Sequence, residues 1–395
     1  MALHIDNIEF DENGRFARFR LINWWDQTRL KRAKILVIGA GALGNEILKN
    51  LALLGIGNIL IADKDIIENS NLSRSALFRE SDNGLKKAEV AAKAIKQIYP
   101  EINVHWFQGD IVDEMGLGVY EWADLVIAGL DNRRARLSVN RSSWKMGRPW
   151  IDGAIEQLDG VVRVFVPPHG SCYECTMSQT DWDILNIERS CNLLTREEML
   201  QGKVPTTPTS ASVIAAIQCQ EALKLLHGLE VLESKAYIFK GLNHDSYVIS
   251  YPRKENCFSH VTYGYIEKTG LRVDGISIAS LLARVKEKLG KDAVIELNRE
   301  IVESLDCANC GTSEPVFKVL NKVTENMARC PICRGERDPR LLHSIHGDEP
   351  FQDKTLADIG IPPFDIIVAR RQMEQIFMEF DADGSDVMGP LWTKA

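Results

Sequence analysis

The most regular hydrophobic pattern of the chain lies between residues 33 and 63. The apolar run KILVI is followed by a glycine turn, by apolar residues at helical spacing, and by a second apolar run, NILIA, that ends at Asp63. A buried strand, an amphipathic helix and another buried strand produce this order of patterns. The segment is therefore predicted to form a strand–helix–strand unit with two parallel strands.

The same alternation continues along the first two thirds of the chain. Helical spacing recurs at 85–98 and 211–226, apolar runs at 102–111 and 123–131, and strand-like patterns with tight turns at 148–168. Alternating strands and helices are typical of a sheet wrapped by helices. We predict an α/β fold, a Rossmann-like domain with a mixed, mainly parallel sheet. Residues 176–210 show little periodicity and are predicted to form a long loop.

The pattern changes character after residue 261. One strong helix is predicted at 277–290 and short strands at positions such as 292–298, which indicates a small α+β domain. We therefore divide the chain into domains 1–261 and 262–395. The last residues, DADGSDVMGPLWTKA, are predicted to be a mobile tail.

Charge and hydropathy exclude some classes of partner. The 395 residues carry a formal charge of −8, which argues against general affinity for nucleic acid or anionic membranes. No apolar run approaches the roughly 18 residues of a membrane span, and the N-terminus has no apolar signal region. A cytoplasmic protein is expected, in which close cysteine pairs favour metal over disulfides.

The cysteine spacing predicts two four-ligand metal sites. CxxC pairs and one CxxH supply thiolate and imidazole ligands in the numbers that Zn²⁺ prefers. The alternative for the first set is a reduced pair without metal. The two sets are Cys172, Cys175, Cys257 and His260, and Cys307, Cys310, Cys330 and Cys333.

Two of the nine cysteines remain outside these sets. Cys219 lies in a segment of helical apolar spacing and is predicted to serve packing. Cys191 lies in the polar stretch NIERSCNLLTREEMLQGK beside Arg189, where an exposed thiolate is electrostatically favoured. Cys191 is therefore a candidate nucleophile, with an ordinary loop cysteine or an alternative metal ligand as the other interpretations.

A glycine motif at the first strand–helix turn predicts a nucleotide site. Gly39, Gly41 and Gly44 form GxGxxG, and Asp63 follows 24 positions after Gly39, where a carboxylate can bind ribose hydroxyls. This pair fits NAD as well as ATP. Further polar residues favour attack at phosphorus in MgATP, because cations neutralise the charge that develops on phosphate oxygens. They are Asn71, Arg74, Lys87, Asp131 and Asn132.

These motifs in their order resemble the ThiF/MoeB superfamily, which includes the activating enzymes of ubiquitin-like proteins. The resemblance rests on GAGALGNEILKNLALLGIGNILIADKDIIENSNLSRSALF, GLKKAEVA, LDN, CYEC and PTTPTSASV, within residues 10–260. It implies an adenylation domain that binds MgATP and a protein ending in glycine. It also implies Zn²⁺ at the first cysteine set, although family members typically have a fourth cysteine where this chain has His260.

The resemblance also implies residue roles. Asp63 matches the ribose-binding acid, Asp131 the residue that positions Mg²⁺, and Arg18 an arginine that reaches the partner's active site in homodimers. Arg18 can equally be a surface charge, and Lys86 is the alternative to Lys87. Ser75 departs from the family, which usually has Gln there. The phosphate-binding set is Asn71, Arg74 and Lys87, and Asp65 and Asn132 complete the nucleotide-binding residues.

The leading hypothesis is an activating enzyme in which Cys191 takes the acyl group as a thioester and passes it to a conjugating enzyme. Its rivals are a sulfur-carrier adenylyltransferase, in which Cys191 is dispensable or bears a persulfide, and a scaffold that binds nucleotide without chemistry. Residues 262–395 would recruit the conjugating enzyme, or else bind the modifier or mediate assembly.

Overall fold

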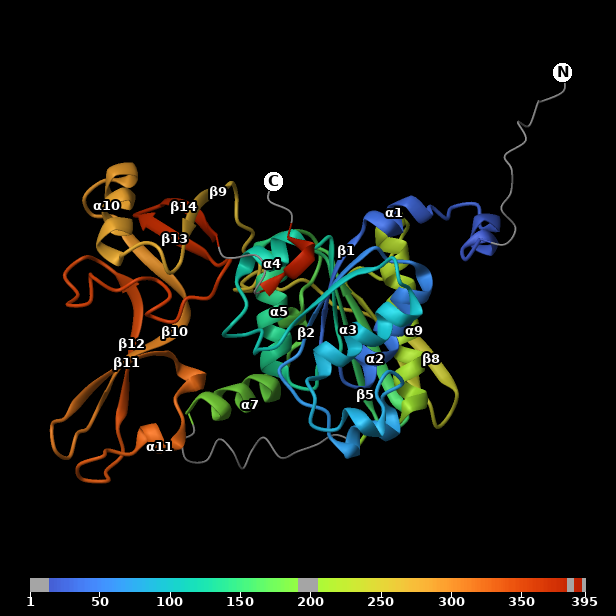
Figure 1. Ribbon diagram of the computed structural model, residues 1–395, viewed down its shortest axis with the longest axis horizontal. Helices are drawn as coiled ribbons and strands as arrows, with labels where there is room; N and C mark the ends of the chain where they lie inside the picture. The colour runs from blue at the N-terminus through green and yellow to red at the C-terminus, as the bar shows by residue number, and fades with distance from the viewer. Residues whose placement is uncertain (1–13, 191–204, 382–386, 393–395) are drawn as a thin grey trace, which may run out of the picture.

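A computed structural model of the protein describes residues 14–190, 205–381 and 387–392. The chain builds two sheets that lie side by side, the first wrapped by helices and the second carrying one long helix (Figure 1). The first sheet has eight strands in the order β3-β2-β1-β4-β5-β6-β7-β8. Its strands are β1 Lys34–Ile38, β2 Asn58–Ala62, β3 Asn103–Phe107, β4 Leu125–Ala128, β5 Trp150–Glu156, β6 Asp159–Phe165, β7 Lys235–Lys240 and β8 Asp245–Ser250.

The first five strands of this order run parallel, and β5 to β8 pair antiparallel. This confirms the predicted α/β fold with a mixed, parallel-rich sheet. The helices around it are α1 Gln27–Arg32, α2 Ala42–Leu54, α3 Lys87–Ile98, α4 Leu117–Trp122, α5 Arg133–Lys145, α6 Tyr173–Thr176, α7 Gln179–Ser190 and α9 Pro208–His227, with 3-10 turns η1 Ala17–Leu21, η2 Asn69–Arg74 and η3 Glu80–Asp82.

Alternate residues of the parallel strands enter two different hydrophobic cores, because successive side chains of a strand point to opposite faces. Ile35 and Val37 pack with α2, α3 and α9 on one face. Leu36 and Ile38 pack with α4 and α5 on the other. Both faces of the central strands are therefore buried, which explains their unbroken apolar runs.

The second sheet is built after residue 265. Its strand order is β11-β10-β13-β14-β9, with β12 paired to β10, and α10 packs against it over a core of its own. The elements are β9 Ile266–Arg272, α10 Ile278–Leu289, β10 Val294–Asp306, β11 Ser313–Val319, η4 Leu320–Lys322, α11 Glu325–Ala328, β12 Asp338–Ile345, β13 Ile366–Arg371 and β14 Glu374–Asp381. The division into domains at residues 261 and 262 stays a prediction.

Two sequence predictions need correction. Part of the predicted loop 176–210 is helix α7, whose first turn is capped by Asp181 accepting from the backbone amide of Ser178 at 2.8 Å. The predicted mobile tail contains an ordered piece. Met388 and Leu391, the latter in the 3-10 turn η5 Gly389–Leu391, are buried in the same core as Leu36 and Leu60 of the first sheet.

In the described ranges, the model contains no helix that combines the length and the apolar character needed to cross a membrane.

Candidate nucleotide site and metal sites

The glycine turn between β1 and α2 leaves room for a ligand at one of its three glycines. A Cβ on Gly39 would lie 2.6 Å from the Gly129 carbonyl oxygen, and one on Gly44 would lie 1.9 Å from the Gly39 carbonyl oxygen. These two glycines therefore permit close packing of the backbone. A Cβ on Gly41 would meet nothing within 4 Å. Gly41 is also the N-cap of α2 and offers no side chain to the amides of the first helical turn. Such a helix end favours anions.

Asp63 stands at the end of β2 against this turn. Its carboxylate accepts from the amide of Ala40 at 2.6 Å and from the amide of Asp65 at 2.7 Å. Burial raises the pKa of Asp63, although both amide bonds favour the charged form. The carboxylate therefore ties the glycine turn to the second strand and fixes its own position.

Lys87 and Asp65 lie beside this carboxylate. Lys87 is the first residue of α3, and its ammonium lies 2.9 Å from the Asp65 carboxylate, with 12% of the lysine side chain exposed. Lys86 is the exposed N-cap of the same helix. Of the two lysines, the structure thus turns Lys87 toward the predicted site.

Asn71, Arg74 and Ser75 belong to η2 and its end. The Asn71 side chain caps the turn by accepting from the Glu68 amide at 3.1 Å, and Arg74 donates to the Ser70 carbonyl at 2.8 Å. Both contacts are local to the turn. Ser75 is buried, and its hydroxyl has no hydrogen-bond partner within the described ranges. The role of Arg74 stays a prediction.

Asp131 and Asn132 lie at the carboxyl end of β4, across the sheet edge from Asp63. Asn132 caps α5 by accepting from the Ala135 amide at 2.8 Å, and it donates to the exposed Asp131 carboxylate at 3.1 Å. The strands β2 and β4 both pair parallel with β1 and thus bring Asp63 and Asp131 to one edge of the sheet, where ligands of such sheets bind.

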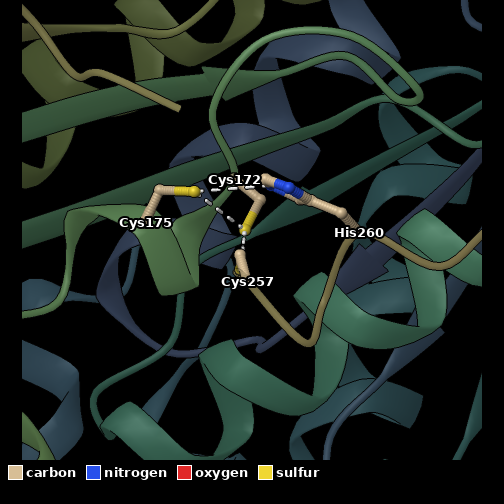
Figure 2. A group of neighbouring side chains, drawn as sticks. All are labelled: Cys172, Cys175, Cys257 and His260. Atoms are coloured by element: carbon tan, nitrogen blue, oxygen red, sulfur yellow. Dashed lines mark hydrogen bonds between the residues drawn. The ribbon is translucent and has the colours of Figure 1, made fainter. Parts of the chain in front are cut away.

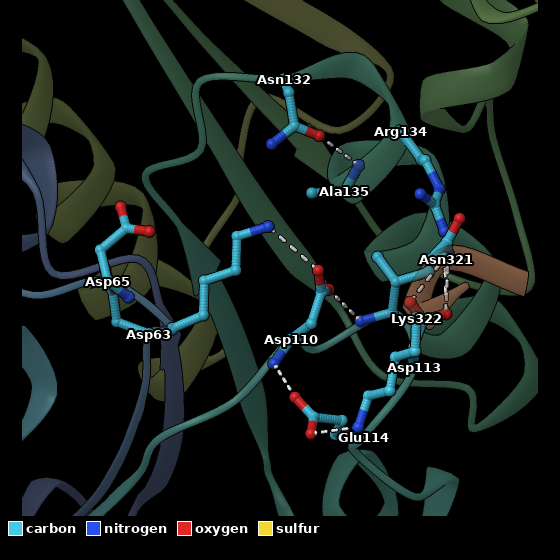
Figure 3. Close-up of polar contacts among 12 residues, drawn as sticks. Asp63, Asp65, Asp110, Asp113, Glu114, Asn132, Arg134, Ala135, Asn321 and Lys322 are labelled. Carbon is cyan, nitrogen blue, oxygen red and sulfur yellow. Dashed lines mark hydrogen bonds and ion pairs between the residues drawn. The ribbon is translucent and has the colours of Figure 1, made fainter. Parts of the chain in front are cut away.

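The sequence reading missed a group of acidic residues that borders this edge. The loop after β3 carries Asp110, Asp113 and Glu114, and Figure 3 shows it between Asp63 and Asp65 on one side and Asn132 and Arg134 on the other. Asp110 pairs with Lys64 at 3.0 Å, and Asp113 lies 3.7 Å from Arg134. Three acids within GDIVDEM were the available signal.

A buried charge cluster was missed as well. Asp152 on β5 is fully buried between Arg136 at 2.9 Å and Arg163 at 2.7 Å. Arg136 also donates to the carbonyl of Leu130, directly before Asp131. An acid within the apolar strand WIDGAI was a readable signal for a paired buried charge.

The first cysteine set converges in space. Figure 2 shows Cys172 and Cys175, which flank the start of α6, facing Cys257 and His260 from the segment after β8. Cys172 Sγ lies 3.7 Å from Cys175 Sγ and 3.5 Å from Cys257 Sγ, and Cys175 Sγ lies 3.4 Å from His260 Nε2. Tetrahedral zinc with Zn–S bonds of about 2.3 Å requires sulfur separations of about 3.8 Å. Burial lowers the pKa of His260 and so favours the neutral imidazole that binds metal.

The second set converges in the same way. Cys307 Sγ lies 3.5 Å from Cys333 Sγ, and Cys310 Sγ lies 3.5 Å from Cys330 Sγ. Both sets could hold a metal ion. Each offers four sulfur or nitrogen donors, which leaves no open position for a reacting molecule, so the donor sets fit structural zinc.

We expect two zinc ions per chain, one for each set. Cys310→Ser and Cys172→Ser should each lower the zinc content to about one ion, because a hydroxyl is a poor zinc ligand. The measurement is elemental analysis of the purified protein. Cys219→Ala is the matched control and should keep both ions. Unchanged metal content in the first two variants would contradict zinc at these sets.

Comparison with known proteins identifies the family. The sequence matches the ThiF family over residues 13–258. The chain belongs to the ThiF family. It is 34% identical over 208 residues to the sulfur carrier protein adenylyltransferase of Thermus thermophilus, an alignment that covers 51% of this chain and 72% of that protein. It is 41% identical over 150 residues to the NEDD8-activating enzyme E1 catalytic subunit of Schizosaccharomyces pombe, covering 37% of this chain but only 34% of that protein.

A solved structure gives the same result for the fold. The crystal structure of E. coli MccB with AMPCPP and MccA matches with a TM-score of 0.52 and 25% identity, over 63% of this chain and 75% of that one. The match to the ThiF family confirms the superfamily that the sequence motifs predicted. The match to the ThiF family ends at residue 258, so the second sheet lies outside it.

Of the remaining predicted residues of this ThiF-family chain, the structure describes Arg18 and Cys219 but not Cys191. Arg18 lies exposed in η1. Cys191 and the contacts predicted for Arg189 fall outside what the structure describes. Cys219 is buried in α9, and burial raises its pKa to about 12, which confirms its assignment to packing rather than chemistry.

Proposed function

We propose that the protein activates the C-terminal glycine of a ubiquitin-like protein by adenylation, takes the acyl group on Cys191 and transfers it to a conjugating enzyme. The observation that carries the adenylation step is the empty space beside Gly41, at an uncapped helix end facing Asp63. ThiF-family membership and the relative named as a NEDD8-activating subunit support the choice of substrate.

The chemistry of the first step follows from the residues at this edge. A carboxylate oxygen of the terminal glycine attacks the α-phosphorus of ATP, and the bond to the pyrophosphate oxygen breaks. Lys87 and Arg74 stabilise the charge on the phosphate oxygens, and Asp63 holds the ribose. Asp131, with its exposed carboxylate, would hold Mg²⁺, which supplies further charge neutralisation when bound.

The second step needs a thiolate close to the adenylate. The Cys191 thiolate attacks the acyl carbon, the acyl–phosphate bond breaks, and AMP leaves. The helix that directly precedes Cys191 supports this assignment. Asp181, in the first turn of α7, pairs with Arg133 at 2.7 Å, two residues after Asp131. The start of the segment leading to Cys191 is thus anchored beside the predicted Mg²⁺ site.

A sulfur-carrier adenylyltransferase is the second candidate. The Thermus relative with this name aligns with the chain over 72% of its own length, a larger share than the NEDD8 relative. In that case adenylation is the complete reaction with ATP and Cys191 forms no thioester. The second sheet, with its cysteine set, would then bind the modifier or mediate assembly instead of recruiting a conjugating enzyme.

Exchange of labelled pyrophosphate into ATP tests the adenylation step. With a glycine-ended ubiquitin-like protein, the wild-type chain should catalyse exchange and Asp131→Ala should lose it by about a hundredfold, because charge stabilisation at phosphorus is lost. No exchange by the wild type with any glycine-ended partner would favour the nucleotide-binding scaffold.

We also propose that the protein is a homodimer in which Arg18 completes the partner's site, and the same assay tests this. Arg18→Ala is expected to be inactive alone, because its guanidinium would complete the partner's site. Mixing it with Asp131→Ala protein should restore one working site per heterodimer. Failure of the mixture to recover exchange would count against a role of Arg18 across the dimer.

A further inference from the structure

The second sheet contacts the loop that borders the nucleotide site. This loop, residues 108–116, connects β3 to α4. At its first end, Gln108 donates to the Lys64 carbonyl at 2.6 Å and Asp110 pairs with Lys64 at 3.0 Å. Lys64 directly follows Asp63. The loop and the predicted ribose-binding carboxylate are therefore linked through one residue, Lys64.

Arg299 on β10 holds the other half of the loop. Its guanidinium donates to the carbonyl oxygens of Val112 and Met115, both at 2.6 Å. Its third contact is the Asp365 carboxylate at 3.1 Å. Arg299 is 8% and Asp365 1% exposed at the side chain, so the pair is buried and its geometry is fixed. A buried arginine that donates to two loop carbonyls stabilises this conformation of the loop, because in another conformation each carbonyl would lose its hydrogen-bond partner.

The turn η4 reinforces the same loop from a second position. Asn321 donates to both carboxylate oxygens of Asp113, at 3.0 and 2.8 Å, and Lys322 pairs with Glu114 at 2.5 Å. Figure 3 shows these two side chains reaching the loop from the outside, while Arg134 approaches Asp113 from α5. The acidic residues of the loop therefore contact both α5, which begins two residues after Asp131, and the turn η4 that follows β11 of the second sheet.

The last loop residue and the first residues of α4 also contact the second sheet through their backbone. The Gly118 amide donates to the Phe364 carbonyl at 2.8 Å, and the Leu117 amide donates to Asp365 at 3.1 Å. A Cβ on Gly116 would lie 2.3 Å from the Pro363 carbonyl oxygen. Loop and second sheet therefore fit closely, and a shift of one moves the other.

We infer that the second sheet positions the nucleotide site, with Arg299 and Asn321 as positioning residues that hold loop 108–116 against Asp63 and α5. This inference rests on the proposed function and deepens it, since it makes ATP affinity depend on residues outside the part of the chain that matches the ThiF family. Neither residue touches the reacting atoms. Their loss should weaken ATP binding more than it lowers the rate of the bound complex.

Calorimetric titration of the full-length protein with MgATP, without any acceptor protein, is the direct test. Arg299→Ala and Asn321→Ala are each expected to weaken binding about tenfold, since small displacements of a site are costly. Arg299→Lys should recover part of the affinity, because an ammonium can still donate to a loop carbonyl. In the exchange assay the same variants should raise the KM for ATP, with kcat and the KM for the acceptor changing less than threefold.

Asn298→Ala is the matched control. Asn298 neighbours Arg299 on β10, and its side chain accepts from Lys145 at the end of α5 at 3.0 Å and from Tyr263 at 3.0 Å. It therefore also links the second sheet to a helix of the first, but within the described residues it makes no hydrogen bond to the loop. It should keep ATP affinity within twofold. Thermal unfolding of each variant shows whether it is folded, and Asn321, which is only half-buried, provides a variant that tolerates substitution if Arg299→Ala does not fold.

The outcomes separate the inference from the proposed function. Wild-type binding of MgATP that Arg299→Ala and Asn321→Ala both retain would overturn the inference alone. Equal weakening by Asn298→Ala would also overturn it, since any loss of contact between the sheets would then suffice. A wild-type chain that binds no MgATP would overturn the proposed function and the inference with it.

Discussion

Gly41→Ala should leave the protein folded and remove most of its affinity for MgATP. The new methyl group meets no protein atom within 4 Å, and φ at this residue is −76°, outside the left-handed region that favours glycine. The expected loss of stability is about 0.5–1 kcal/mol, for alanine in place of glycine at a helix N-cap. The methyl group instead occupies the space through which a phosphate approaches the helix amides. We expect at least a tenfold weaker affinity in the calorimetric titration.

Gly44→Ala is the matched contrast three residues away. Its methyl group would lie 1.9 Å from the Gly39 carbonyl oxygen, and backbone atoms cannot yield as a flexible side chain can. We expect a loss of about 3 kcal/mol or more in the free energy of unfolding, at the upper end of overpacking costs. Chemical denaturation measures this difference. If Gly41→Ala binds MgATP like the wild type, the phosphates do not lie at this turn.

The first sheet was predictable because its signals are local. Its parallel strands are buried on both faces, so runs such as KILVI and NILIA stand out from the helices between them. The polar residues at the strand ends were predictable for the same reason. Asp63 and Asp131 each follow a buried run directly, and parallel strands bring such ends to one edge.

The errors concern segments whose order comes from distant contacts. The tail was predicted to be mobile because terminal residues are often poorly ordered, yet Met388 and Leu391 are buried in the same core as Leu36 and Leu60, more than 300 positions away. Helix α7 has few apolar positions at regular spacing, and its first turn is fixed by Asp181, which also pairs with Arg133 on α5. The pairing of Asp181 with Arg133 and the burial of the tail have no signature in the local sequence. Ser178 and Asp181 were an available local signal, because they follow the S-x-x-D pattern that caps a helix start.

The contacts around the candidate site were beyond the sequence for a related reason. Lone arginines and asparagines in strands and turns are usually solvated, so nothing marked Arg299 or Asn321 as partners of a loop near residue 112. The metal sets were the exception among long-range features, because the spacing of cysteines itself encodes which residues meet.

Cys191→Ala should abolish a covalent adduct that the wild type forms. Incubated with MgATP and a glycine-ended ubiquitin-like protein, the wild-type chain should gain the partner's mass minus water in non-reducing intact mass spectrometry. A thioester would explain this mass, and a thiol reagent should remove it. Of the cysteines, seven fall into the two ligand sets and Cys219 is buried with its pKa raised to about 12, which leaves Cys191 as the available nucleophile.

Cys219→Ala provides the control, because it removes a thiol that lies outside both ligand sets and should keep the adduct. Adenylate formation without an adduct in the wild type would favour the sulfur-carrier adenylyltransferase. In that enzyme a sulfur donor would attack the acyl carbon of the adenylate directly, and AMP would leave. An adduct that survives in Cys191→Ala would instead point to a thiol of the ligand sets. The second cysteine set contains the better candidates, because Cys310 and Cys333 are exposed, whereas Cys172 and Cys175 are buried.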